Sequence, residues 1–231
     1  MTRRAALPFG LLLLGLAAAC SSVRETASKV DWKAPPAGPP GTEARMGDQS
    51  EPRLEALAEA APHEAPGADL ARAAALSRQA SERRAAGDLP GAIVAQREAL
   101  TLREAALGPD APDVAATQTV LAGLYAAADR YADAEPLLRR ALAIREQAFG
   151  ADGRLTALSR NNLALLLAAE GNTAEAELLY LQAIAVLEKG DPADLATVLG
   201  NYAALLDDTG RHEEAVTTEE RAATLRTLRA P

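Results

Sequence analysis

The stretch DRYADAEPLLRRALAIRE, residues 129–146, decides the fold, because similar stretches follow it in the chain. GNTAEAELLYLQAIAVLE occupies residues 171–188, and GRHEEAVTTEERAATLRT occupies residues 210–227. An alanine lies five residues after a glycine or aspartate in each stretch, and residues 87–92 repeat this spacing earlier in the chain. These alanines are 42, 42 and 39 residues apart: Ala92, Ala134, Ala176 and Ala215. Such a period is typical of arrays of helical hairpins, in which each hairpin buries its apolar face on its neighbours.

The apolar residues within each repeat follow the intervals of two amphipathic helices, which we name helix A and helix B. In the second repeat, the predicted buried residues are Leu121, Ala122, Leu124 and Tyr125 in helix A and Ala134, Leu138 and Ala141 in helix B. In the third repeat, they are Leu163, Ala164 and Leu167, then Ala176, Tyr180 and Ala183. These positions recur every three or four residues, which predicts one buried face per helix. Asp129, Gly171 and Gly210 mark helix ends, where a positive φ is expected.

These patterns resemble the tetratricopeptide repeat, and AEPLLRRALAIREQAFG at residues 134–150 resembles its kinesin-light-chain type. The resemblance extends over about residues 70–229 and implies an all-α fold. It predicts an α-solenoid of about four hairpins over residues 69–229, with units at about 72–113, 114–155, 156–194 and 195–229. The terminal units depart from the family pattern with polar residues, which we interpret as solvent-facing caps. These residues are Gln79, Arg83, Gln96 and Glu219.

The first residues, MTRRAALPFGLLLLGLAAAC, have the pattern of an export signal. Two arginines precede an apolar stretch that is too short to span a bilayer comfortably. LAAAC resembles the lipobox of bacterial lipoproteins, although Ala17 stands where that family usually has leucine. The resemblance implies a signal peptide at residues 1–19 and lipidation, including palmitate, on Cys20, the only cysteine of the chain. An ordinary secretory signal cleaved after an A-x-A sequence is the alternative.

Residues 20–68 are rich in proline, alanine and glycine, as in the stretch KAPPAGPPG. Prolines at this density block regular helix and favour an extended chain. We therefore predict a disordered tether that holds the folded array away from the membrane, with a helical turn or two at residues 53–60 as an alternative. Ser21 and Ser22 stand where lipoproteins of the inner membrane typically carry aspartate. This resemblance implies an outer-membrane lipoprotein of the bacterial cell envelope, facing the periplasm.

The family resemblance places twelve helix A residues on the concave side of the array. They are Ser77, Arg78 and Ser81, Thr119, Val120 and Gly123, Asn161, Asn162 and Leu165, and Gly200, Asn201 and Ala204. Asn162 and Asn201 hold equivalent positions, where peptide-binding members often carry asparagine, whose amide both donates and accepts hydrogen bonds. Arg160 lies two residues before Asn162 and is expected to reach an acidic ligand group. The alternative is that the asparagines bond to neighbouring helices or are simply solvated, and Val120 limits the site to two units.

Several functional classes lack support in this sequence. The formal net charge of −8 argues against nucleic acid, whose phosphates require a basic surface. One cysteine and the two histidines, His63 and His212, do not provide the ligand spacing of a metal site, so no metal and no cofactor is expected. No phosphate-binding glycine loop and no nucleophile motif appears, so we predict no catalytic residues and no enzyme.

We therefore predict a lipid-anchored adaptor or scaffold that binds a protein or peptide segment in its concave groove. The predicted groove residues are Arg160, Asn161, Asn162, Leu165 and Asn201, and lipid on Cys20 provides the contact with the membrane. Two alternatives stay open. One is an assembly or pilotin-like factor that binds a folded subunit of an envelope complex, and the other is a homo-oligomeric tether that self-associates through its end repeats.

Overall fold

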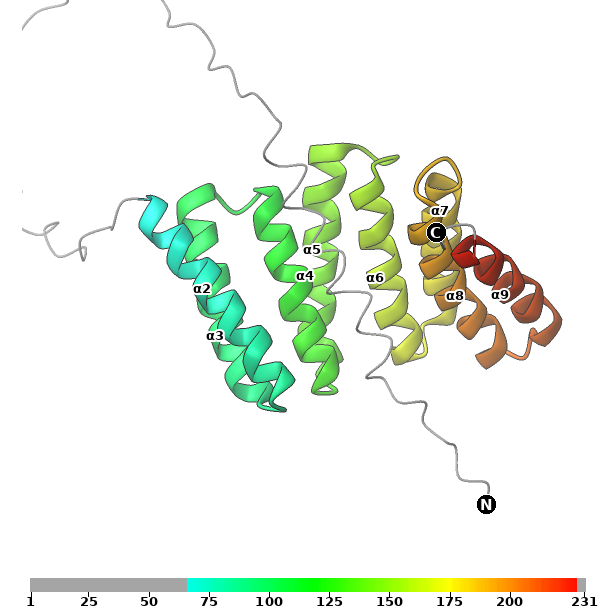
Figure 1. Ribbon diagram of the computed structural model, residues 1–231, viewed down its shortest axis with the longest axis horizontal. Helices are drawn as coiled ribbons and strands as arrows, with labels where there is room; N and C mark the ends of the chain where they lie inside the picture. The colour runs from blue at the N-terminus through cyan, green and yellow to red at the C-terminus, as the bar shows by residue number, and fades with distance from the viewer. Residues whose placement is uncertain (1–65, 228–231) are drawn as a thin grey trace, which may run out of the picture.

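The computed structural model describes residues 66–227, and the predicted signal peptide, Cys20 and the tether up to residue 65 lie outside this range. The described chain folds into consecutive helices that lie side by side in chain order (Figure 1). The helices are α2 (Pro66–Ala85), α3 (Leu89–Leu107), α4 (Pro112–Ala127), α5 (Tyr131–Phe149), α6 (Arg154–Glu170), α7 (Thr173–Leu187), α8 (Pro192–Asp208) and α9 (His212–Thr227). None of these helices combines the length and the apolar character needed to cross a membrane.

The described residues form four antiparallel hairpins, and the prediction of an all-α array is confirmed. Helix A and helix B of each repeat are α2 and α3, α4 and α5, α6 and α7, and α8 and α9. Each hairpin packs on the next through helix B of one unit and helix A of the following unit. Helix A of the third unit also contacts helix A of the second and fourth units, which places these helices on one side of the array.

Prolines begin several of the helices. Pro66, Pro112 and Pro192 are the first residues of α2, α4 and α8. Proline is tolerated there because a backbone N–H at the first helical position forms no hydrogen bond within the helix. Residues 66–68, which the composition places in the tether, therefore lie in helix α2. Proline at this position indicates the start of a helix, and its fixed φ favours the first turn.

The predicted turn residues lie between helix A and helix B of their hairpins, as expected. Gly171 and Gly210 have φ values of 86° and 82°. Asp129 has a φ of 57°, and within residues 66–227 it is the one residue other than glycine with a positive φ. Gly171 closes α6 with its backbone N–H directed to the carbonyls of Ala168 and Leu167. These conformations let the chain reverse direction within a few residues, so that helix B returns along helix A.

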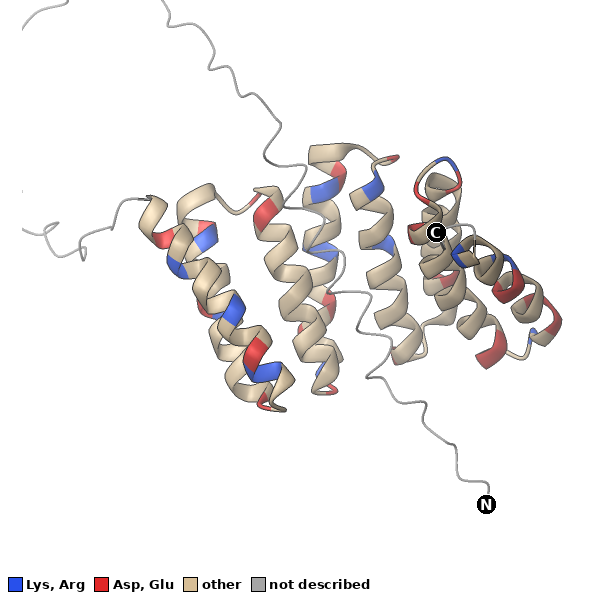
Figure 2. Ribbon diagram, in the orientation of Figure 1, with Lys and Arg blue, Asp and Glu red and all other residues tan. Residues whose placement is uncertain are grey.

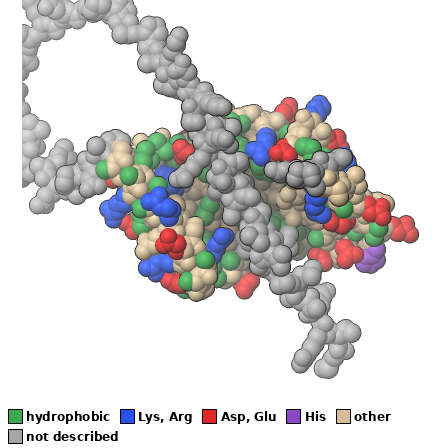
Figure 3. Space-filling view, in the orientation of Figure 1, with side chains coloured by type: hydrophobic (Ala, Val, Ile, Leu, Met, Phe, Trp, Pro, Cys, Tyr) green, Lys and Arg blue, Asp and Glu red, His purple; other side chains and the backbone are tan. Residues whose placement is uncertain are grey.

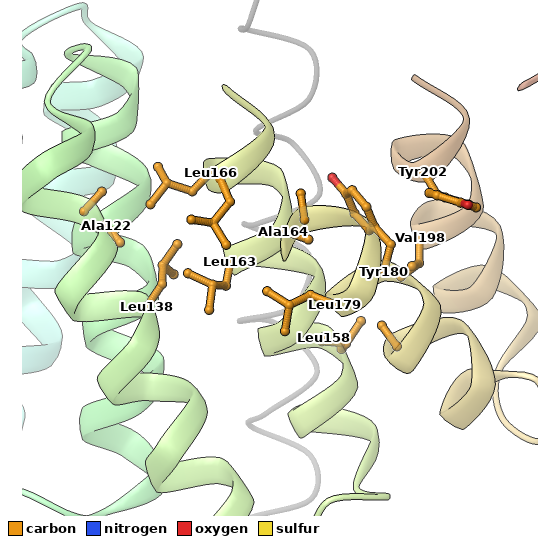
Figure 4. Close-up of a cluster of buried hydrophobic side chains, with 14 of the residues drawn as sticks. Ala122, Leu138, Leu158, Leu163, Ala164, Leu166, Leu179, Tyr180, Val198 and Tyr202 are labelled. Atoms are coloured by element: carbon orange, nitrogen blue, oxygen red, sulfur yellow. The ribbon is translucent and has the colours of Figure 1, made fainter. Parts of the chain in front are cut away.

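The core runs through the whole array and contains the residues that the repeat pattern predicted. Ala134, Ala164, Ala176 and Ala183 are 0% exposed, because helices A and B approach each other closely at these alanines. Leucines fill the wider spaces between the hairpins, as Figure 4 shows for Leu138 and for the leucines of α6. The other predicted core residues are also buried: Leu121, Ala122, Leu124, Tyr125, Ala141, Leu163, Leu167 and Tyr180.

One polar residue assigned to a cap lies instead in the core. Gln96 is 1% exposed, and its Nε2 donates to the carbonyl of Thr117 over 3.3 Å, so it joins α3 to α4. The interpretation of Gln96 as a solvent-facing cap is therefore wrong, because α4 covers this side of α3. Gln79 and Arg83 of α2 and Glu219 of α9 are exposed. These three residues lie on the end helices of the array, α2 and α9, which pack on other helices of residues 66–227 from one side.

Tyr180 is fully buried between α7 and α8, with its ring centroid 6.0 Å from that of Tyr202 (Figure 4). Its hydroxyl lies among the buried polar atoms of residues 66–227 that have no hydrogen-bond partner. Burial raises the pKa of this hydroxyl above its ordinary value. A buried donor without a partner loses its hydration and gains nothing in return, so the hydroxyl destabilises the fold.

Tyr180→Phe is therefore expected to raise the free energy of unfolding by about 1 kcal/mol, because it removes the unpartnered hydroxyl and keeps the ring. Urea denaturation followed by circular dichroism measures this change. Tyr202→Phe is the matched control, since the Tyr202 hydroxyl donates to Glu177 over 2.8 Å, and its loss should lower stability. A Tyr180→Phe protein that unfolds at a lower urea concentration than the native protein contradicts the prediction.

Candidate functional site

Three of the predicted site residues join into a chain of side-chain amides across α6 and α8. Nδ2 of Asn201 donates to Oδ1 of Asn161 over 2.9 Å, and Nδ2 of Asn161 donates to Oδ1 of Asn162 over 3.3 Å. We call these three residues the amide row. Asn161 and Asn162 are only 6% and 7% exposed, whereas Asn201 is half-buried. The row therefore links helix A of the third unit to helix A of the fourth.

The two ends of the amide row have unused hydrogen-bonding capacity. Within residues 66–227, no hydrogen bond is formed by Nδ2 of Asn162, a donor, or by Oδ1 of Asn201, an acceptor. Asn162 is 7% exposed and Asn201 is half-buried, so Asn201 is the more accessible end of the row. One donor and one acceptor on the same face match the two groups that a peptide backbone presents, its carbonyl and its N–H.

The internal bonds of the row hold these end groups in place. An asparagine side chain on a helix surface turns freely about two bonds, and fixing it on binding costs free energy. Here Asn161 is bonded on both sides, so Asn162 and Asn201 are oriented before any partner arrives. The alternative, in which the asparagines bond to neighbouring helices, therefore describes Asn201 as well as Asn161, because their bond joins α8 to α6. The same bonds position the two outer residues of the row.

Arg160 lies apart from the amide row. Its Nη1 donates to the carbonyl of Ala151 over 2.8 Å, and its Nη2 donates to Oε1 of Glu146 over 2.9 Å. The side chain is 8% exposed and ties α6 to the end of α5 and the loop between them. With its guanidinium bound to Glu146, Arg160 has a partner within its own chain in place of an acidic ligand group.

The predicted positions that share α6 and α8 with the row carry small or apolar side chains, whereas Thr119 in α4 is 2% exposed. Val120 and Leu165 are half-buried, and Ala204 is exposed. Gly200 faces α9, because a Cβ there would lie 2.8 Å from Nη2 of Arg226. Among the twelve predicted positions, Arg78 in α2 is the one charged residue. The face near the row thus offers hydrogen bonds and apolar contact, and its residues in α4, α6 and α8 carry no formal charge.

Two arginines that the sequence analysis did not single out, the half-buried Arg103 and the buried Arg145, form equivalent bonds between units. Arg103 at the end of α3 donates to Oγ1 of Thr117 in α4 over 2.7 Å, and Arg145 in α5 donates to Oγ of Ser159 in α6 over 2.6 Å. Both pairs span the junction between helix B and the next helix A. Arg103 also donates to Oγ of Ser77 in α2 over 3.0 Å. The sequence contains a signal for these bonds, because an arginine and a hydroxyl residue 14 positions later, Arg103 with Thr117, recur after 42 residues as Arg145 with Ser159.

Ion pairs connect neighbouring helices, and basic and acidic residues are interspersed along the array (Figure 2). Arg139 of α5 binds Glu175 of α7 over 2.9 Å, and Arg211 binds Glu177. The hydrogen bonds from Arg211 and from the Tyr202 hydroxyl hold the pKa of Glu177 below its usual range. These pairs are partly exposed, so each is worth little alone, but they neutralise the acidic residues of α7.

Comparisons with known proteins agree with this architecture. The sequence model of the tetratricopeptide repeat matches residues 71–147 and 113–189, which together make up more than half of the chain. The crystal structure of BtubC (BKLC) from P. vanneervenii is similar, with a TM-score of 0.63 and 21% identity over 74% of this chain and 68% of that one. The crystal structure of a kinesin-light-chain-type protein of nearly identical TPR-like repeats from Podosopora anserina is also similar. Its TM-score is 0.58, and the two sequences are 22% identical over 69% of this chain and 78% of that one. Comparison with curated proteins gives no match.

Proposed function

The chain belongs to the tetratricopeptide repeat family, whose fold is a scaffold for protein–protein interaction, and on this premise we propose that it is a lipid-anchored adaptor. Its partner is a segment of another protein, which lies along the helix A side of the third and fourth units. The amide row is the observation that carries this proposal. It leaves a donor on Asn162 and an acceptor on Asn201 for an extended backbone.

The proposed binding is non-catalytic. Asn162 donates to a backbone carbonyl of the segment, and Asn201 accepts from a backbone N–H. Leu165 and Ala204 provide apolar contact beside these bonds. Because the backbone groups are common to all peptides, the amide row supplies affinity, and the neighbouring side chains supply the preference for one segment.

The proposed anchor is lipid on Cys20, at the end of a stretch that resembles a lipobox. Several acyl chains on one residue bind a membrane stably, because each buried CH₂ contributes about 0.8 kcal/mol. The residues after Cys20 support a position in the outer membrane of the bacterial envelope, with the array in the periplasm. An anchored array of this kind holds its partner close to the membrane.

Site-specific photo-crosslinking tests which side of the array binds the partner. A photo-reactive amino acid replaces Ala204, beside the amide row, or Val94, which is 65% exposed on the outer side of α3. Irradiated cells that make the protein should yield a crosslinked partner from position 204 and not from position 94. Crosslinking from position 94 alone contradicts binding at the amide row. That result points instead to a folded subunit bound on the outer surface, as expected of an assembly or pilotin-like factor.

A further inference from the structure

The connections between consecutive hairpins all have the same length. Helix B of one unit is joined to helix A of the next by residues 108–111, 150–153 and 188–191, which are four residues in each case. Each connection turns the chain back, so that helix B packs on the helix A that follows it. Helix α2 begins at Pro66. A helix B that precedes α2 with the same connection would therefore end at residue 61.

The sequence before Pro66 has the pattern of a short amphipathic helix that ends at this point. We call RLEALAEAA, residues 53–61, the leading segment, which lies outside the residues that the structure describes. It consists of residues that favour helix, without proline or glycine. Its apolar residues Leu54, Leu57, Ala58 and Ala61 follow the intervals i, i+3, i+4 and i+7, which place them on one face of a helix. A proline follows at position 62, and a residue before proline disfavours helix.

Leu54 occupies a position that is apolar before every other helix A of the array. It precedes Pro66 by twelve residues. Leu100, Leu142 and Tyr180 precede the first residues of α4, α6 and α8 by the same number. Leu100 and Leu142 are half-buried against the core, and Tyr180 is fully buried. The pattern that forms the junctions inside the array is therefore also present before α2.

The outer side of α2 corresponds to a side that is covered in the next unit. Ala75 and Leu76 precede Thr117 and Gln118 of α4 by 42 residues. Thr117 and Gln118 are only 3% and 4% exposed, and Arg103 of α3 donates to Oγ1 of Thr117. In α2, by contrast, Ala75 is exposed and Leu76 is half-buried. A helix that lies on α2 as α3 lies on α4 would cover both residues.

We propose that the leading segment forms a helix that packs antiparallel on the first half of α2, in the place that helix B takes at the other junctions. A helix of nine residues is about 13 Å long, so it extends from the start of α2 to about its middle. The first half of α2 presents the exposed Ala68 and Ala75. The second half, residues 77–85, contains four charged residues and stays in contact with solvent. The composition of α2 changes where the proposed cover ends.

The charges of the two elements are complementary. Residues 51–64 contain four glutamates and one arginine, which gives a formal net charge of −3 with His63 neutral. Helix α2 contains four arginines and two acidic residues, which gives +2. On the face seen in Figure 3, basic side chains gather over the α2–α3 end of the array. Opposite charges attract each other, so this end of the array favours an acidic segment.

The leading segment belongs to the same chain, which lowers the cost of the contact. A helix of nine residues is marginal alone in water, so its packing on α2 has to supply the stability. Because four residues connect the segment to α2, the contact does not carry the translational cost of binding a separate molecule. The proposed contact lies on the first unit, whereas the amide row lies on α6 and α8. The partner site therefore stays open when the leading segment is packed.

Disulfide trapping tests the contact on the full chain carrying Cys20→Ser. Ala58→Cys combined with Ala68→Cys should form an intramolecular disulfide, because the proposed helix places both positions on the contact side. Glu59→Cys with Ala68→Cys is the matched control, since residue 59 lies on the opposite face of the helix at nearly the same separation along the chain. The first pair should oxidise about tenfold faster, because a disulfide requires two closely placed and correctly directed side chains. Equal rates for the two pairs, or faster oxidation of the control, overturn the proposal.

Thermal unfolding of the full chain tests the apolar contact without paired cysteines. Leu54→Glu should lower the midpoint by about 2–4 °C, because it places a carboxylate against α2. Val30→Glu is the control, since it introduces the same charge into the tether outside the leading segment and should leave the midpoint unchanged. Circular dichroism follows both transitions. An unchanged midpoint for Leu54→Glu, or an equal decrease for Val30→Glu, overturns the proposal.

Discussion

Leu167→Ala is expected to lower the free energy of unfolding by about 2–5 kcal/mol, the range for removing a buried leucine side chain from a core. Leu167 is 2% exposed in α6. The α6–α7 hairpin contains Ala164, Ala176 and Ala183, which have no side-chain length to move into a void. The cavity left by the substitution therefore stays open, and the cost should fall in the upper part of this range.

The same substitution should also reveal how the array transmits stability. Each hairpin contacts mainly its two neighbours, so weakening the third unit removes the support of the fourth. Urea denaturation followed by circular dichroism should show a lower midpoint and a broader transition. Leu107→Ala is the control, because Leu107 is 39% exposed at the end of α3 and should lose far less stability. Equal losses for the two variants contradict a core centred on the hairpin interfaces.

The repeat period made the fold predictable, because it specifies three things at once. It places the alanines where two helices meet, the leucines between hairpins, and the residues with positive φ at the turns. Ala134, Leu138 and Asp129 illustrate these three roles, and the structure confirms each of them. The boundary at Pro66 was harder to predict, because proline disrupts the interior of a helix but is also favoured at its first position.

The site was harder to predict, because it depends on how side chains on different helices bond to each other. The sequence indicates that Asn162 and Asn201 are equivalent, but the bond from Asn201 runs to Asn161, one residue away from the equivalent position. Arg160 has the charge expected of a ligand contact, but Glu146 lies within reach on α5 and binds it. Similarly, Gln96 looks like a cap in the sequence, and only the position of α4 buries it.

Asn162→Ala with Asn201→Ala is expected to reduce partner capture at least tenfold, which corresponds to about 1.4 kcal/mol. Each substitution removes one hydrogen bond to the partner, and such bonds contribute about 1 kcal/mol each. The double variant also leaves Asn161 without its two amide partners, so its stability is measured alongside. Asn172→Ala serves as the control, because Asn172 is an exposed amide at the start of α7, away from the row.

The most direct test of the central claim is a crosslinking pull-down from native membranes with the full chain, the double variant and the Asn172→Ala control side by side. All three proteins should show similar helical circular dichroism before capture is compared. One partner should be recovered with the native chain and with the control, and should be lost with the double variant. Recovery of the same partner in equal amount with a folded double variant would contradict binding at the amide row.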